Sequence, residues 1–393
     1  MPSSISVRAL TQIDDIDAHT WDALNDQSGG SYLCSHHFLK AFETTACVIP
    51  KTGWQAQHLI VESSPHENPA QKEVIAVMPL YVKGHSYGEF VFDWAWADAY
   101  QRNGLDYYPK WLCGVPFTPV SGARLLTSDK SRETAAQALM QWVQASKLSS
   151  LHVLYTTAVD QQALIDAGCL ARTHTQFHWR NAKWPSFDAF LATLTQPKRK
   201  KIRAERRKVS QAGVEMTAKT GDQISPEDWQ FFYRCYAHTY AMRGNKPYLT
   251  EAFFSAIDPA HCLLILASQE GQPVASALLF LDQTTDPISG QVKRKLYGRY
   301  WGGLAHIDCL HFEVAYYAPI QWAIENNIDV IEGGAQGEHK MARGFVPVQT
   351  QSAHWLAHPG FFEAVENYLT QERAGNAAYA ASLNSPFRDD PHD

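Results

Sequence analysis

The 393-residue sequence lacks long apolar runs, although 45% of its residues are hydrophobic. No stretch approaches the roughly 20 consecutive apolar residues that cross a bilayer as a helix. The N-terminus, MPSSISVRAL, has no charged segment followed by an apolar one, so we expect no secretory leader. These absences argue against a membrane span and predict a soluble, cytoplasmic protein.

Metal-binding motifs are also missing. The sequence has neither a C-x-x-C pair nor H-E-x-x-H, and CSHH (34–37) sets its ligands too close together for a zinc finger. The seven cysteines are odd in number and scattered, which argues against a disulfide framework and favours reduced thiols. We therefore expect no metal site and no permanently bound cofactor.

The chain is acidic overall, and one segment carries a large excess of positive charge. The net charge is −6, yet residues 198–208 (KRKKIRAERRK) carry +7, which leaves −13 on the rest. In a helix, Ile202 and Val209 would share one side, while the other sides would hold basic residues, among them Arg199, Arg203 and Arg206. Guanidinium groups chelate phosphate oxygens, so a phosphate-bearing ligand (a nucleotide, coenzyme A or RNA) is predicted here, the alternative being a solvated helix. The acidic remainder argues against DNA.

Helical and strand patterns alternate along the chain, which predicts an α/β protein with helices covering sheets. The pattern restarts after NAKWPS, so we predict two domains, residues 1–185 and 186–393. We expect Ser225 to cap a helix over 225–243, Asp308 to cap one over 308–327, and Pro319 to kink the latter. The other expected helices are 131–147, 160–168 and 360–373, and the expected strands are 73–83, 151–155, 173–179, 262–268, 273–281 and 294–302.

Gly84-His85-Ser86-Tyr87-Gly88 fits the G-x-S-x-G elbow of serine hydrolases. That elbow must lead directly into a helix, whereas EFVFDWAW follows here. We therefore expect Ser86 not to be a nucleophile, and a glycine-framed turn fits better.

Residues 87–117 combine ten aromatic side chains with four acids, Glu89, Asp93, Asp98 and Asp106. Such a segment forms a packed core, or it lines a pocket in which burial raises the basicity of a carboxylate. Both alternatives stay open from the sequence. Asp93 and Trp94 are our candidates for substrate contacts in this segment.

The segment EGGAQGEHKMARGF (332–345) gathers glycines and both signs of charge directly after a predicted strand. Glycines at a strand end allow sharp turns with exposed amides, and ligands gather beyond the carboxyl ends of strands. Glu338 and His339 are candidate bases, and Lys340 and Arg343 are candidate partners for phosphate or carboxylate. The alternative is a left-handed turn followed by a short solvated helix.

Further candidates come from the predicted helix 308–327 and the strand before it. His311 and Glu313 would lie near the first turn of the helix, and Arg299 lies on the strand. Acids at a helix start commonly serve only as dipole partners. We rank Glu338 first as general base, then Glu313, then His339.

Five segments in order give the chain a specific resemblance: PLYVKGHSYGEFVFDWAWADAY, YYPKWLCGVPFTPVSGARLL, LYGRYWGG, LHFEVAYY and EGGAQGEHKMARGF. They resemble the FemAB-like family of bacterial N-acyltransferases, the peptidoglycan biosynthesis/recognition family. The basic run resembles the K-x-R-x-x-I-R-x-x-R stretch that opens the second domain in the wider superfamily. The resemblance implies two GNAT-like acyltransferase domains, each a mixed sheet flanked by helices, with a cleft between them.

The implied reaction passes an acyl or aminoacyl group to an amine, either a small molecule or a cell-wall precursor. QGEHKMARG does not spell the [QR]-x-x-G-x-[GA] loop that holds coenzyme A in GNAT enzymes. Acyl-CoA and aminoacyl-tRNA thus remain alternative donors and co-substrates. The competing hypothesis is a noncatalytic module that binds tRNA or a cell-wall precursor through the basic helix.

Overall fold

The computed structural model describes residues 3–65, 71–286, 289–335 and 337–389, which fall into two compact units. The first unit holds residues 1–174, 285–291 and 349–379, and the second holds the remainder. The points at which the chain passes from one unit to the other include positions inside the strands β9 (Leu170–Arg180) and β15 (Val346–Leu356). The units therefore interleave in sequence, whereas the predicted boundary near residue 185 would give two continuous segments.

The first unit contains a four-stranded antiparallel sheet in the order β1, β3, β4, β7. Its strands are β1 (Ser3–Leu10), β3 (His58–Pro65), β4 (Glu73–Met78) and β7 (Leu126–Thr127). Helix α4 (Arg132–Ala145) contributes Ala135, Leu139 and Val143 to the same core, each at most 1% exposed. Their spacing of four residues places them on one helix face.

The other strands of this unit pair in the order β15, β8, β6, β5, β2. Strands β8 and β6 are parallel, while the remaining described pairs are antiparallel. They are β8 (Ser150–Leu154), β6 (Lys110–Cys113), β5 (Leu80–Lys83) and β2 (Trp54–Ala56). The remaining helices of the unit are α1 (Ala18–Gln27), α2 (His36–Thr44), α3 (Trp94–Arg102), α5 (Ala158–Asp166) and α12 (Pro359–Ser382).

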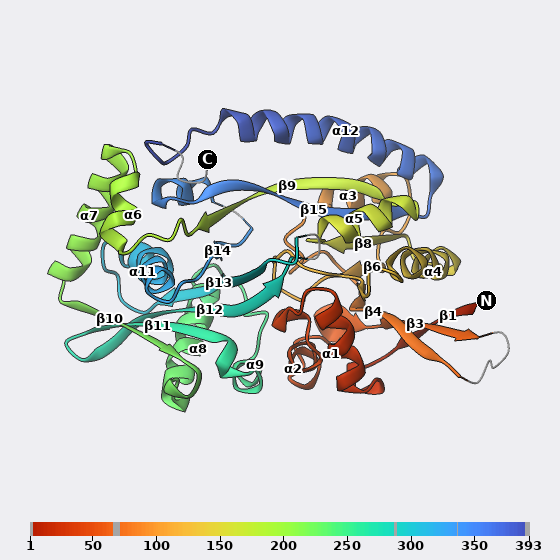
Figure 1. The fold of residues 1–393 in the computed structure, drawn as a ribbon, viewed down its shortest axis with the longest axis horizontal. Coiled ribbons are helices and arrows are strands. Elements are labelled where there is room, and N and C mark those ends of the chain that lie inside the picture. The colour runs from red at the N-terminus through yellow and green to blue at the C-terminus, as the bar shows by residue number, and fades with distance from the viewer. Residues whose placement is uncertain (1–2, 66–70, 287–288, 336, 390–393) are drawn as a thin grey trace. The chain divides into compact units, whose positions relative to one another are not determined.

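The second unit orders its strands β10, β11, β12, β13, β14, β9 (Figure 1). They are β10 (Val214–Thr220), β11 (Cys262–Gln269), β12 (Gln272–Thr285), β13 (Val292–Gly303) and β14 (Val330–Glu332), followed by β9. Strands β13 and β14 are parallel, while β14 and β9 are antiparallel. This unit is therefore built on a mixed sheet.

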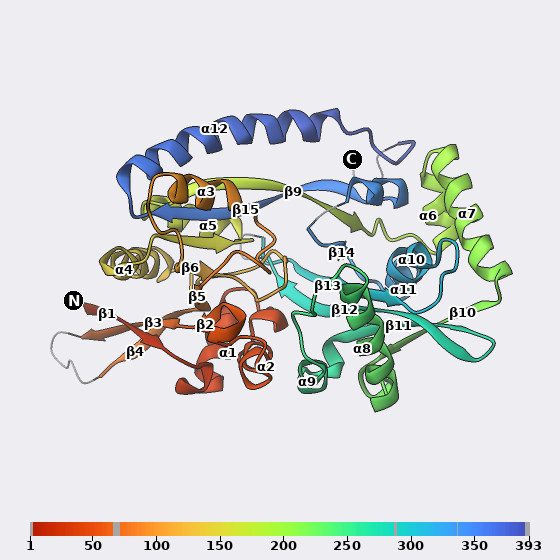
Figure 2. The same cartoon turned by 180° about the vertical axis from the view of Figure 1, so that it is seen from behind.

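Helices cover both faces of this sheet. They are α6 (Phe187–Thr193), α7 (Gln196–Gln211), α8 (Pro226–Ala241), α9 (Glu251–Ala256), α10 (Leu310–Phe312) and α11 (Ala318–Glu325). Helices α8 and α9 lie on one side of β11 and β12, and α11 lies on the other (Figures 1 and 2). Alternate residues of β11, Leu263 and Ile265, share a core with Ile202 and Val209 of α7. The period of two in the strand and the two-turn spacing in the helix produce this contact.

The predicted fold class, α/β with mixed sheets flanked by helices, is confirmed. Ser225 caps α8 as expected, its Oγ accepting a hydrogen bond from Asp228 N at 3.2 Å. Asp308 does not cap the later helix, because Cys309 occupies that position with a φ of 67°. Pro319 follows a π-helical segment, Glu313–Tyr317, after which α11 begins. In the described part of the chain, no helix is long and apolar enough to span a membrane.

Candidate functional site

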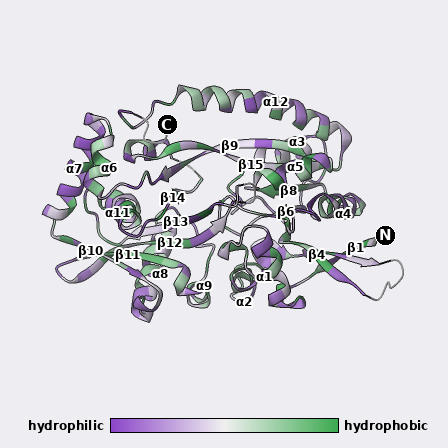
Figure 3. Cartoon of the chain, viewed as in Figure 1, coloured by the Kyte–Doolittle hydropathy of each residue, from purple (hydrophilic) through white to green (hydrophobic). Residues whose placement is uncertain are grey.

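Helix α7 carries the basic segment, and its apolar side is the predicted one. Ile202 and Val209 are 1% and 2% exposed, while Figure 3 shows much of the helix in the hydrophilic colour. Arg199 does not face a ligand site, because its guanidinium donates to the carbonyl oxygens of Ala192 and Leu194 at 3.3 Å. That contact closes the end of α6.

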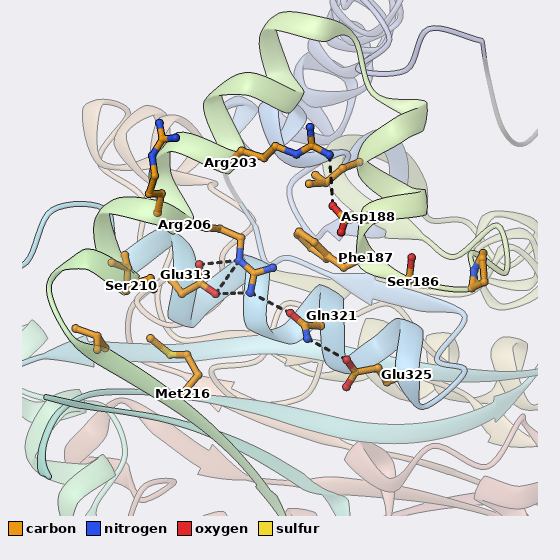
Figure 4. Close-up of a pocket in the computed structure, with 15 residues that line it drawn as sticks. Ser186, Phe187, Asp188, Arg203, Arg206, Ser210, Met216, Glu313, Gln321 and Glu325 are labelled. Carbon is orange, nitrogen blue, oxygen red and sulfur yellow. Dashed lines mark hydrogen bonds and ion pairs between the residues drawn. The ribbon is translucent and has the colours of Figure 1, made fainter.

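Arg206 is held by a buried acid from another element. Its Nε donates to both carboxylate oxygens of Glu313 at 3.1 Å, and its Nη2 donates to Gln321 Oε1 at 2.9 Å (Figure 4). Glu313 is 4% exposed, and burial raises the pKa of its carboxyl group while Arg206 opposes that rise. Glu313 is thus an ion-pair partner of α7, more than a dipole partner of its own helix.

These residues line a pocket of about 760 Å³ within the second unit (Figure 4). Its charged lining consists of Arg203, Arg206, Arg207, Asp188, Glu313 and Glu325. Arg203 lies 3.4 Å from Asp188, with both side chains more than half exposed. Arg207 forms no ion pair with any residue that the structure describes. Two guanidinium groups, those of Arg203 and Arg207, are therefore weakly held or unpaired and can meet a ligand.

The glycine-rich segment begins where β14 ends beside the longer strand β13. Strands β13 and β14 pair only over residues 295–297 and 330–332, although β13 continues to Gly303. Gly334 and Gly337 follow β14 with φ of 84° and 123°, a conformation that favours glycine. The chain needs these two glycines to turn away from the sheet.

A small cavity of about 100 Å³ lies beside the end of β14. Its walls come from β12, β13, β14, α10, the π-helical segment and the residues after β14: Ala277, Leu278, Leu279, Gly298, Arg299, Tyr300, Trp301, His311, Ala315, Tyr316, Ile331, Gly333 and Phe345. His311 lies against Trp301 with ring centroids 4.3 Å apart. Burial lowers the pKa of His311 to about 4, so its imidazole is neutral at pH 7. The structure thus brings the predicted Arg299 and His311 together.

Lys340 and Arg343 are buried, whereas a solvated turn would expose them. Each is 2% exposed. Lys340 Nζ donates to Gly334 O at 3.2 Å, and burial, with the charge of Arg299, lowers the pKa of Lys340 to about 8. Arg343 Nη2 donates to Glu205 Oε2 at 3.1 Å, and its guanidinium lies 3.6 Å from the Phe312 ring. Arg343 therefore braces α7 and is not positioned as a substrate contact.

Glu338 and His339, ranked first and third as candidate bases, lie at the surface in the 3₁₀ segment Glu338–Arg343. His339 Nε2 lies 3.1 Å from the hydroxyl of Tyr316, which lines the small cavity. Partial burial lowers the pKa of His339, with Lys340 and Arg343 adding to the effect. The imidazole is therefore mainly neutral at pH 7 and can accept a proton.

Asp93 and Trp94 lie in the first unit and differ in accessibility. Asp93 is 3% exposed and accepts hydrogen bonds from Lys110 and from the Tyr107 hydroxyl. Trp94 is 41% exposed. Asp93 is therefore a buried ion-pair partner, and only Trp94 can touch a ligand directly.

Two lysines that were not among the predicted site residues, Lys83 and Lys110, lie fully buried beneath that segment. Lys110 Nζ donates to Ser86 Oγ at 2.7 Å and to Glu89 Oε2 at 2.8 Å. Burial raises the pKa of Glu89 to about 7 and lowers that of Lys83 to about 7. Each lysine borders an apolar strand, LYVK or KWLC, and that position was the available signal.

No helix follows Ser86 directly, since α3 begins only at Trp94. The hydrolase elbow is therefore absent, as the sequence predicted. Among the described residues, no three His, Cys, Asp or Glu side chains gather as a metal site requires.

Comparison with known proteins identifies a family over nearly the whole chain. The family described as FemAB-like, peptidoglycan biosynthesis/recognition, matches residues 12–389. No curated relative matches the chain.

Several solved structures are similar over most of the chain. A tandem GNAT protein from the clavulanic acid biosynthesis pathway is 11% identical, with a TM-score of 0.47, and the match covers 91% of this chain and 99% of that one. L-PGS from Bacillus licheniformis is 10% identical, with a TM-score of 0.46, covering 90% and 97%. N-myristoyltransferase from Saccharomyces cerevisiae with bound myristoyl-CoA is 12% identical, with a TM-score of 0.44, covering 91% and 83%.

Proposed function

This chain belongs to the FemAB-like family, and we propose that it is an N-acyltransferase that moves an acyl or aminoacyl group from an activated donor to an amine. The acceptor is a small amine or a cell-wall precursor, and the donor is acyl-CoA or aminoacyl-tRNA. The reaction forms an amide bond, breaks the thioester or ester of the donor, and releases the proton of the attacking amine.

The observation that carries this proposal is the cavity beside β13 at the end of β14. Beyond the last residue of β14, main-chain groups of β13 lose their partners in that strand and can face a ligand. Gly298 and Gly333 line this cavity without side chains, so a bound group can approach the backbone closely. Lys340 packs behind this wall, since a Cβ added at Gly333 would lie 3.0 Å from Lys340 Cδ. Its positive charge favours the oxyanion of a tetrahedral intermediate formed in the cavity.

The volume of the cavity favours a small reacting group. About 100 Å³ is well below the roughly 300–1,000 Å³ of pockets that enclose whole ligands. The cavity can therefore hold the acyl carbon and a few neighbouring atoms, while the rest of the donor lies outside. A short acyl group or the backbone end of an aminoacyl group meets this limit.

His339 becomes the first candidate for the proton acceptor, ahead of Glu338. Its imidazole contacts the hydroxyl of Tyr316 at 3.1 Å, and Tyr316 lines the cavity. Glu338 is exposed in the same 3₁₀ segment and is the second candidate. Glu313 falls to third place, because both of its oxygens accept from Arg206 and it lines the larger pocket instead.

The larger pocket on α7 is our candidate for the donor's phosphate groups. Arg203 and Arg207 would bind them, and Arg206 would stay with Glu313. Both pockets share the π-helical segment as a wall, Glu313 lining one pocket and Ala315 and Tyr316 lining the other. One donor with separate phosphate and acyl parts could therefore use both.

Turnover tests the proposal against the noncatalytic alternative. Purified protein is offered acetyl-CoA, or alanyl-tRNA, together with a muropeptide precursor that carries a free amine, and mass spectrometry detects an added acetyl or alanyl group. We expect transfer from one donor, and His339→Gln should lower kcat by about 10²–10⁴-fold if its proton transfer is required. Binding of tRNA or precursor without transfer from either donor would favour the binding module.

A further inference from the structure

A third pocket, of about 660 Å³, lies in the first unit. It is formed by α3 and the loop that follows, and its side chains include Trp94, Asp98, Leu105, Asp106, Tyr107 and Tyr108. Its volume falls within the range of roughly 300–1,000 Å³ that is typical of small-molecule sites. We call it the Trp94 pocket.

The lining of the Trp94 pocket favours a positive charge. Its described residues include two carboxylates, Asp98 and Asp106, and no lysine, arginine or histidine. Asp106 forms no ion pair within the described chain. Asp98 lies 3.6 Å from Arg102, but both side chains are at least 66% exposed, so water screens this pair and a ligand can compete for the carboxylate.

Three aromatic rings line the same pocket, those of Trp94, Tyr107 and Tyr108. The face of an aromatic ring attracts a cation through its quadrupole, most strongly for tryptophan. Ring faces combined with carboxylates therefore recognise an organic ammonium group better than an inorganic cation. An inorganic cation would contact the carboxylates but not the apolar ring faces. A neutral apolar ligand, in turn, would leave the two carboxylates without a role.

The tyrosine wall is fixed from behind by buried hydrogen bonds. The Tyr107 hydroxyl donates to Asp93 at 2.7 Å, and the Tyr108 hydroxyl lies 2.8 Å from Ser86 Oγ. Lys110 donates to Ser86, Glu89 and Asp93. Lys110 thus lies behind the rings, its Nζ 5.4 Å from the Tyr107 centroid and 5.7 Å from the Tyr108 centroid, in ion pairs with Glu89 and Asp93. The rings are therefore held in place before any ligand arrives.

Trp94 is likewise held at the surface. Its ring lies edge to face with Tyr87, with centroids 5.1 Å apart, and Tyr87 packs against His85 at 5.2 Å. Trp94 and Tyr87 remain 41% and 56% exposed. Large aromatic groups left open to solvent beside a pocket are typical of ligand-binding surfaces.

We propose that the Trp94 pocket binds an organic cation, a protonated amine, between the faces of Trp94 and Tyr108 and the carboxylates of Asp98 and Asp106. Binding at this site needs no donor and no turnover, so its test does not depend on the proposed acyl transfer.

The test uses pentylammonium and its neutral counterpart pentan-1-ol at pH 7.5, where the amine is charged. The indole N–H signal of Trp94 in a nitrogen-15 NMR spectrum, assigned by its loss in Trp94→Phe, reports on the pocket. We expect a saturable shift with pentylammonium and affinity about tenfold weaker for pentan-1-ol. Equal shifts from both probes, or no saturable shift with pentylammonium, would overturn the proposal.

Two sets of variants test whether the carboxylates of Asp98 and Asp106 recognise the positive charge of the ligand. Asp98→Asn with Asp106→Asn should weaken pentylammonium binding by about tenfold and leave the weak pentan-1-ol response unchanged. Glu133→Gln, an exposed acid on α4, is the matched control and should bind like the wild type. Both substituted aspartates are exposed, so the variant should fold, as circular dichroism can verify. Unchanged affinity in the double variant would show that the carboxylates do not recognise the cation.

Discussion

Arg206 Nε donates to both carboxylate oxygens of Glu313 at 3.1 Å, which ties helix α7 to the π-helical segment of the same unit. The acid is almost fully buried, while the arginine side chain is 31% exposed. The two partners therefore differ in what their removal leaves behind. Loss of the arginine leaves a buried carboxylate unpaired, whereas loss of the carboxylate leaves a guanidinium that water can reach.

Arg206→Met should therefore lower the free energy of unfolding by about 2–4 kcal/mol at pH 7. Without Arg206, burial alone would set the pKa of Glu313, above its value in the unfolded chain. The penalty is then fully present above the raised pKa of the folded protein, shrinks as the pH falls from that value towards the unfolded pKa, and is absent below the unfolded pKa. Urea denaturation at pH 7 and pH 4 measures both effects.

Arg203→Met is the matched control, because its partner Asp188 is 82% exposed and the pair should contribute less than about 1 kcal/mol. Arg206→Met combined with Glu313→Leu should recover most of the lost stability, since no buried charge remains. Equal stability of the two single arginine variants would contradict the buried-partner argument.

The sequence predicted the apolar side of α7 but not the role of each arginine. Ile202 and Val209 follow from helical spacing alone. Two of the ion pairs made by this helix involve distant segments, since Glu313 lies 107 residues beyond Arg206 and Arg343 lies 138 beyond Glu205. The charges within residues 198–208 therefore predicted more unpaired basic side chains than the folded protein has.

The glycine-rich segment shows the same limit. Its glycines and strand-end position were readable from local patterns, and they lead to the small cavity. The burial of Lys340 was not readable, because it depends on packing against Gly333, whose added Cβ would lie 3.0 Å from Lys340 Cδ. Lysine in a polar segment is normally exposed, so the sequence favoured the wrong environment.

Gly298→Ala tests whether the cavity holds the acyl group. A Cβ there would lie 3.5 Å from Glu332 O and 4.0 Å from Leu279 Cδ2, so the methyl group fits but occupies space in the cavity. We expect turnover to fall by about tenfold or more, because small displacements of the reacting carbonyl are costly. Stability should change by less than about 1 kcal/mol.

Gly114→Ala is its control, since the added Cβ would lie 3.8 Å from Leu154 Cβ in the first unit, outside the cavity. Steady-state kinetics and thermal unfolding of both variants give the comparison. Equal turnover by Gly298→Ala and wild type would place the acyl group elsewhere.

Arg203 and Arg207 should bind the donor's phosphate groups. Replacing both by glutamate should weaken binding of the productive donor by about tenfold or more, because charge-assisted contacts to phosphate are lost and repulsion is added. Lys200→Glu is the control, since Lys200 is exposed on α7 but outside the pocket. Calorimetric titration at low and moderate salt measures the affinities. Matching losses in the control would indicate a general charge effect.

Lys340 should make stability depend on pH in the alkaline range. Its folded pKa of about 8 lies below the ordinary value of 10.5, so the unfolded chain binds more protons between these values. Stability should therefore rise as the pH increases from 8 to 10.5, with the penalty fully present below pH 8. The rise is on the order of 3 kcal/mol, taking about 1.4 kcal/mol for each pKa unit.

Lys340→Met should remove that rise and be more stable than the wild type at pH 7, while acyl transfer falls. Other lysines and tyrosines also titrate here, so the difference between variant and wild type is the quantity to measure. A constant difference from pH 7 to 10.5 would show that Lys340 is not desolvated in the folded protein.

Ser86 should not react as a nucleophile, although Lys110 Nζ lies 2.7 Å from its hydroxyl. A lysine activates serine only when neutral, and the carboxylates of Glu89 and Asp93 raise the pKa of Lys110 against the effect of burial. Lys110 is thus a donor to Ser86 and cannot take its proton at neutral pH.

Ser86 also lacks the following helix, since α3 begins at Trp94. A fluorophosphonate probe should therefore leave the protein unlabelled from pH 7 to 9, with trypsin labelled in parallel as the reagent control. Stoichiometric labelling that disappears in Ser86→Ala would mean that Lys110 is neutral and that the charge assignment of this buried cluster is wrong.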